Sequence, residues 1–172
     1  EKERDVVLQG HLKRTLEEEL LILSEALRGP LKAAYEKPAK ERTEQQVALL
    51  EEYPNVGKIS SGSLYLYNRK RSQRAAAIET IATKKEMAHL QRVQQEQLVA
   101  LPTAQQAAVT AALAVPAKQR TETQQTLLKQ FPGPAVTAAT LKDYAPEAAA
   151  EVARYRQVVS QVKTIDSKKE LD

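Results

Sequence analysis

Leucines recur along the first part of the chain at the spacing of one face of an α-helix. Between Asp5 and Leu27 the intervals are four, four, four, three and four residues. The leucines concerned are Leu8, Leu12, Leu16, Leu20, Leu23 and Leu27. This period predicts an amphipathic helix. We expect Gly29 and Pro30 to end it, and Pro30 to start a second, short helix that runs to about Lys37.

A second pattern is a repeat of the chain's own sequence. Residues 38–54 return as residues 116–132, and the match extends back without gaps to the pair His11 and His89. Of the 44 pairs in that match 19 are identical, whereas roughly three would be expected by chance for this composition. We therefore interpret the chain as a tandem duplication.

The repeated segment carries signals that shape the backbone. In each copy a threonine is followed three residues later by a glutamine, Thr43 by Gln46 and Thr121 by Gln124. This spacing predicts a capping box that starts a helix. A proline disfavours helical geometry in the residue before it, so a proline after each helix should end it. We expect a loop over residues 55–62, then short turns of helix.

These patterns predict an all-α fold of two tandem helical repeats, each of about 80 residues, that share a long central helix. The expected units are residues 1–87 and 88–172, with a helix at about 71–101 that bridges them. Little alternation of β-branched residues is present, which argues against a sheet.

Composition narrows the possible chemistry. The chain of 172 residues has a net charge of +4 and no cysteine, so it holds no thiolate metal site, cysteine nucleophile or covalent c-type haem attachment. No apolar run approaches the ~20 residues that span a bilayer. The start, Glu1 to Asp5, is unlike a signal peptide. We expect the chain to be a mature or excised piece of a longer protein.

The two histidines, His11 and His89, occupy equivalent positions of the repeat. One interpretation is a pair of metal or haem ligands on equivalent helices, because neutral imidazole is a common ligand. The other is an inherited surface histidine beside a core leucine. No usual ligand lies three or four residues after either histidine, which favours the second interpretation.

A basic cluster follows two tyrosines near the middle of the chain. Residues 55–101 carry a net charge of +5 and residues 1–54 a net charge of −3. Clustered cations beside aromatic rings could grip phosphates and stack on bases, and the alternatives are a solvated face or a patch that meets an acidic partner. The candidate residues are Tyr65, Tyr67, Arg69, Lys70, Arg71 and Arg74.

Catalytic patterns are sparse. Glu17 to Glu19 form a carboxylate run, but the second copy replaces two of the three by glutamine, so we interpret the run as a solvated face. Ser60 to Ser63 have no histidine nearby in the sequence, and capping of a following helix explains these serines better than catalysis. We predict that the chain is not an enzyme and has no cofactor and no catalytic residue.

Three strings, Arg42–Gln46, Leu49–Val56 and Ser60–Tyr67, resemble a helical stretch in large planctomycete proteins of unknown function. Those proteins combine a c-type cytochrome-like domain with two planctomycete-specific domains. The second copy, which ends at Leu127–Gly133, is similar to the same stretch. The resemblance implies an export-bound protein of the periplasm or cell envelope, in which this part connects flanking domains. The haem-attachment cysteines are absent, so electron transfer is not carried over, and no site residue of the family maps onto this chain.

We therefore predict a helical scaffold, spacer or protein-interaction region of a larger envelope-associated protein. Its expected partners are flanking domains or an acidic protein surface, with no membrane span. One alternative is a nucleic-acid-binding module that uses Arg69 to Arg74. A third is haem or metal binding through His11 and His89.

Overall fold

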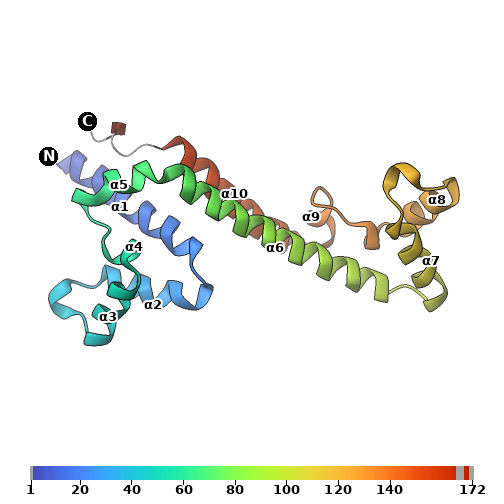
Figure 1. Ribbon diagram of the computed structural model, residues 1–172, viewed down its shortest axis with the longest axis horizontal. Coiled ribbons are helices and arrows are strands. Elements are labelled where there is room, and N and C mark those ends of the chain that lie inside the picture. The colour runs from blue at the N-terminus through green and yellow to red at the C-terminus, as the bar shows by residue number, and fades with distance from the viewer. Residues whose placement is uncertain (1, 166–168, 171–172) are drawn as a thin grey trace. The chain divides into compact units, whose positions relative to one another are not determined.

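The computed structural model describes residues 2–165 and 169–170, and every regular element in these ranges is helical (Figure 1). The all-α prediction is confirmed. The chain divides into two compact units, which are residues 1–81 with 155–172, and residues 82–154. This division differs from the expected boundary between residues 87 and 88, and it groups residues 155–165 with residues 2–81.

The helices of the first unit, and the helix that leaves it, are α1 (Lys2–Ile22), α2 (Glu25–Glu36), α3 (Glu44–Glu52), α4 (Pro54–Gly57), α5 (Leu64–Arg69) and α6 (Arg71–Val99), with 3₁₀ turns at Ala39–Glu41 and Ser61–Ser63. The elements that follow are α7 (Thr103–Ala114), α8 (Glu122–Gln130), α9 (Leu141–Tyr144) and α10 (Pro146–Thr164), with 3₁₀ turns at Ala117–Gln119 and Gly133–Ala135. Helices α6 and α10 each contribute residues to both units.

The first helix ends earlier than predicted. It stops at Ile22, and Pro30 lies inside α2 rather than at its start. The side chain of Arg28 explains the difference, because its Nε and Nη2 donate to the carbonyls of Leu23 and Leu21, at 3.1 Å each. The last carbonyls of a helix lack intrahelical hydrogen-bond donors, and the guanidinium of Arg28 supplies donors for these two. The chain can therefore break at Ser24, six residues before Pro30.

A second arginine closes α2. The Nε of Arg42 donates to the carbonyl of Lys37 and its Nη2 to that of Tyr35, at 3.0 Å each. The next residue begins α3 with the predicted capping box, since the amide of Gln46 donates to Thr43 Oγ1 at 3.3 Å and the amide of Thr43 to Gln46 Oε1 at 3.1 Å. This short connector thus satisfies the end of one helix and the start of the next.

The second unit contains the same kind of connector. Arg120 Nε donates to the carbonyls of Ala112 and Val115, at 3.1 and 2.9 Å, and so closes α7. The capping box of Thr121 and Gln124 is formed, with distances of 3.0 and 3.3 Å. Both predicted capping boxes are therefore confirmed.

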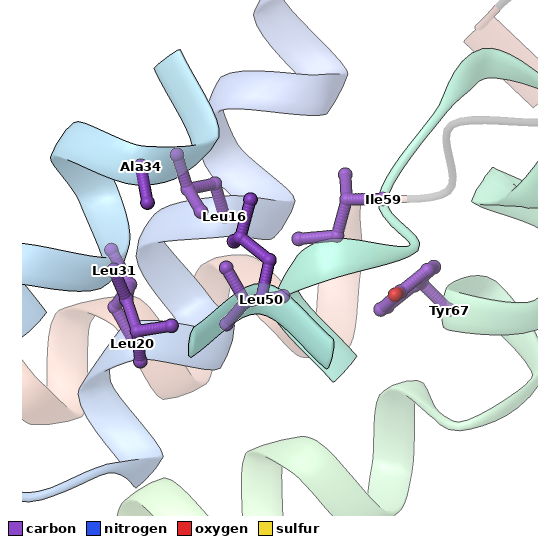
Figure 2. Packing of buried hydrophobic residues seen from close by; sticks show 8 residues of the cluster. Leu16, Leu20, Leu31, Ala34, Leu50, Ile59 and Tyr67 are labelled. Carbon is purple, nitrogen blue, oxygen red and sulfur yellow. The ribbon is translucent and has the colours of Figure 1, made fainter. Parts of the chain in front are cut away.

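The core of the first unit lies among α1 to α5. Figure 2 shows the labelled side chains of this core turned toward one another. The buried members are Leu16, Leu20, Leu31, Ala34, Leu50, Val56, Ile59 and Tyr67. Full burial of one such leucine stabilises the fold by about 1.5–3 kcal/mol. Leu16 and Leu20 of the predicted leucine stripe are thus buried on the inner face of α1, whereas Leu23 and Leu27 lie beyond the end of that helix and pack against the same core.

The second unit has two smaller buried clusters. One contains Val93, Val136 and Leu141. The other contains Val109, Ala112 and Leu128, which are the counterparts in the sequence repeat of the buried residues Leu31, Ala34 and Leu50 of the first unit. Equivalent positions of the repeat are therefore buried in each unit.

The loop expected over residues 55–62 is in part helical. Pro54 opens the short helix α4, and a 3₁₀ turn covers Ser61–Ser63. The fixed φ of proline suits the first helical position, so Pro54 starts one helix as well as ending α3.

Gly57 is a position where packing requires glycine. An added Cβ would overlap the backbone carbonyl of Leu50, whereas a Cβ at Gly10 in α1 would meet nothing within 4 Å. We expect Gly57→Ala to lower the free energy of unfolding by about 1–3 kcal/mol. Gly10→Ala, the matched control, should raise it by about 0.5–1 kcal/mol through helix propensity. Urea unfolding followed by circular dichroism measures both, and equal stability of the two variants would contradict this packing.

Candidate functional site

The basic cluster lies where α5 meets α6, in the first unit. Arg69 and Lys70 are exposed, and Tyr65 is 55% exposed. Tyr67 and Arg74 instead point inward and are only 8% and 6% exposed. The structure therefore divides the predicted cluster into a surface part and an interior part.

Arg74 is held by carboxylates of α1. Its Nε lies 2.8 Å from Glu18 Oε2, and its Nη1 lies 3.4 Å from Glu19 Oε1. The same Nη1 donates to the carbonyl of Tyr67 at 3.0 Å. The guanidinium thus connects α1 with α5 and α6, and it is not presented to an outside phosphate.

The interpretation of Glu17 to Glu19 as a solvated face is wrong for two of its members. Glu18 is buried and Glu19 nearly so, because both carboxylates turn toward Arg74. Burial raises the pKa of both carboxyl groups above the ordinary value, and the positive charge of Arg74 opposes that rise. The single positive charge of the Arg74 guanidinium is therefore shared by two carboxylates that are largely removed from water.

Tyr67 has a structural contact of its own. Its hydroxyl donates to the backbone carbonyl of Asn55 at 2.7 Å. Burial, with smaller contributions from Glu19 and Tyr35, raises the pKa of Tyr67 to about 12. The hydroxyl therefore remains a hydrogen-bond donor at neutral pH, and it ties α4 to α5.

Arg71 also has an internal contact, since its Nη1 donates to the carbonyl of Ile165 at 3.1 Å. The exposed candidates are thus Tyr65, Arg69 and Lys70, and Leu66 beside them is 43% exposed. Sequence reasoning missed Leu66 as a surface residue, although the helical spacing of Leu64 and Tyr67 as core positions would place Tyr65 and Leu66 outside.

A groove of about 270 Å³ opens beside this surface. Part of its lining comes from α4 and the residue after it, and part from α5 and the residues that flank it. Glu19 is also in the lining. Sequence reasoning did not single out Lys58, because its proximity to Lys70 depends on the fold. We call this depression the α4–α5 groove; its lining is Glu19, Pro54, Asn55, Lys58, Ser63, Leu66, Tyr67 and Lys70.

His11 lies inside the first unit rather than on its surface, with only 2% exposed. The guanidinium of Arg14 contacts its Nδ1, and its Nε2 lies 3.0 Å from Glu170 Oε2 without hydrogen-bond geometry. Burial lowers the pKa of His11 below 6.5; Arg14 adds to this effect and Glu170 opposes it.

His89 lies in the second unit and is 24% exposed. Its Nε2 is 2.8 Å from Glu151 Oε2, and Lys85 donates to the other oxygen of the same carboxylate at 2.7 Å. These two hydrogen bonds lower the pKa of Glu151. The arrangement joins α6 to α10 through one shared carboxylate.

Neither histidine lies in a ligand cluster within residues 2–165 and 169–170, since no group of three or more histidine, cysteine, aspartate or glutamate side chains there could hold a metal ion. Over the same residues no helix has the length and apolar character needed to span a bilayer.

In comparisons with known proteins, no family model matches the chain, and no curated protein or solved structure matches it. The contacts described above are therefore the basis on which a function is proposed.

The lowered pKa of His11 makes stability depend on pH. As the pH falls below 6.5, the ordinary pKa of histidine, His11 takes up a proton in the unfolded chain but not yet in the folded chain. Stability is therefore lost between pH 6.5 and the lowered pKa of folded His11. We expect wild type to lose stability relative to His11→Gln as the pH is lowered from 6.5 toward the lowered pKa of His11. Chemical unfolding measures the difference. An imidazole NMR titration of His11 with its midpoint at or above the ordinary value would contradict this account.

Proposed function

We propose that this chain is a tandem helical repeat that acts as a non-catalytic scaffold and binds a protein partner through the exposed face of α5. The observation that carries the proposal is a difference between the two copies. Positions that build helix ends and cores recur in both copies, whereas the exposed apolar and basic residues of α5 and its end are replaced at their counterpart positions in the second copy.

Recurrence at helix ends supports the repeat. Arg42 and Arg120 are counterparts in the aligned copies, and each donates to the last carbonyls of the preceding helix. Gln106 is the counterpart of Arg28, and it donates to the carbonyl of Leu101 at 2.7 Å, which is the counterpart of Leu23. Under this proposal α6 is the last helix of the first copy and the first helix of the second.

Divergence on the surface supports the binding role. In the register that pairs Tyr67 with Tyr144, the buried Leu64 likewise recurs as Leu141. The exposed residues between and after them do not recur: Tyr65, Leu66, Arg69 and Lys70 are replaced by Lys142, Asp143, Pro146 and Glu147. The second copy still buries Leu141, so the helical turn forms without the apolar and basic set. A set that folding does not require is a candidate for binding.

A protein partner suits this surface better than nucleic acid. Tyrosine and arginine are enriched among residues that dominate binding at protein interfaces. A phosphate backbone would gain little from Arg74, which is held by two carboxylates, and it would approach Glu19 in the adjoining groove. We propose the setting in a larger envelope-associated protein on the resemblance to the planctomycete proteins alone.

Site-specific photo-cross-linking tests the proposal. A benzophenone side chain replaces Tyr65 in one variant and Lys142, its counterpart on the second copy, in the control. After irradiation in the cells of origin, we expect position 65 to give a protease-sensitive adduct and position 142 to give none. An adduct that nuclease removes would support the nucleic-acid alternative. No adduct at position 65 would contradict the binding role.

A further inference from the structure

We propose that the α4–α5 groove binds an acidic peptide segment, with a carboxylate of the peptide between Lys58 and Lys70 and a neighbouring apolar side chain against Leu66 and Tyr53. This inference rests on the proposed protein-binding function and names the chemistry of the partner.

Charge is the first observation. Lys58 follows α4 and Lys70 follows α5; both lysines line the groove, and both are exposed. Glu19 is the one carboxylate in the lining, and it is only 11% exposed because Arg74 holds it. The accessible charge is therefore positive, and Arg69 beside Lys70 adds to it. Carboxylates paired with ammonium groups at the edge of an interface provide specificity and speed association.

The apolar half of the site is the second observation. A neighbouring depression of about 250 Å³ shares Glu19, Pro54 and Asn55 with the groove. It adds the apolar residues Ile22, Leu23, Tyr53 and Val56. This depression offers contact for an aliphatic side chain, and Leu66 of the groove adds apolar surface. A peptide that alternates acidic and aliphatic residues matches the basic groove with its carboxylates and the apolar depression with its aliphatic side chains.

The walls are held in place before any ligand binds. Ser63 Oγ donates to the carbonyl of Lys58 at 2.7 Å, which fixes the backbone that carries that lysine. The hydroxyl of Tyr67 fixes Asn55 in the same way. Binding to a preorganised groove avoids part of the entropy cost of ordering loops.

Size and charge distinguish a peptide from a nucleic acid here. Each depression is near the lower end of volumes that hold a small ligand, so one side chain fills each. Glu52 lines the second depression and is exposed, so it would repel a row of phosphates. A peptide can avoid this carboxylate by placing an apolar side chain there.

Fluorescence anisotropy on the full chain tests the proposal. The probe is a labelled peptide of alternating glutamate and leucine, and its control has glutamine in place of glutamate. We expect the acidic peptide to bind, and its affinity to fall as salt rises from about 50 to 300 mM. Lys70→Glu introduces the residue that the second copy has at this position, Glu147, and should weaken binding roughly tenfold or more.

Further variants separate the two halves of the site. Leu66→Asn, an uncharged polar residue of the size of the counterpart Asp143, should weaken binding by a comparable factor with little salt dependence of the loss. Lys142→Glu on α9 is the matched control and should leave affinity unchanged. Circular dichroism establishes that each variant is folded, and if Leu66→Asn is not folded, Lys70→Glu decides alone.

Three results would overturn the proposal: equal binding of the glutamine peptide, equal loss in Lys142→Glu, or an oligonucleotide that binds more tightly than the peptide. If position 65 forms a protein adduct in cells but the acidic peptide does not bind, the scaffold function stands and the acidic-peptide proposal fails. If neither occurs, both fail.

Discussion

The first unit depends on one interior contact, in which the guanidinium of Arg74 meets the carboxylates of Glu18 and Glu19. Removing a charge from water costs several kcal/mol, and only a close partner with good geometry offsets that cost. The contact links α1 to α6 and orders the start of the long helix. It also removes one cation from the basic cluster and keeps Glu19 at the wall of the α4–α5 groove. The surface that remains is the small set of Tyr65, Leu66, Arg69 and Lys70.

The requirement that helix ends be satisfied explains much of the rest. Each hairpin, α2 with α3 and α7 with α8, is joined by an arginine that holds carbonyls and a threonine that caps amides. These contacts are local and use side chains of the connector itself. Exposed positions elsewhere are therefore free to differ between copies. In the proposed function, that freedom allows Tyr65, Leu66, Arg69 and Lys70 to form a binding surface that the counterpart positions of the second copy lack.

Local features could be predicted from the sequence. Helical period and capping spacing act within a few residues, so the helical class and both capping boxes followed from them. The break between α1 and α2 near Ser24 could not be predicted in this way, because it is stabilised by the side chain of Arg28, which belongs to α2. A signal was present nonetheless, since Pro102 lies at the matching position of the second copy. The pairing of Arg74 with Glu18 joins positions far apart in the chain, and no local pattern could show it.

A double-mutant cycle between Arg74→Met and Glu18→Gln in the full chain tests most directly whether Arg74 belongs to the interior. Contacting residues in a buried charged network couple by about 0.5–3 kcal/mol, whereas independent sites add within about 0.3–0.5 kcal/mol. We predict a favourable coupling energy above about 1 kcal/mol in urea unfolding at neutral pH. A coupling energy within about 0.3 kcal/mol of zero would contradict the account. Arg74 would then be a surface cation, and the basic cluster would again be one continuous patch.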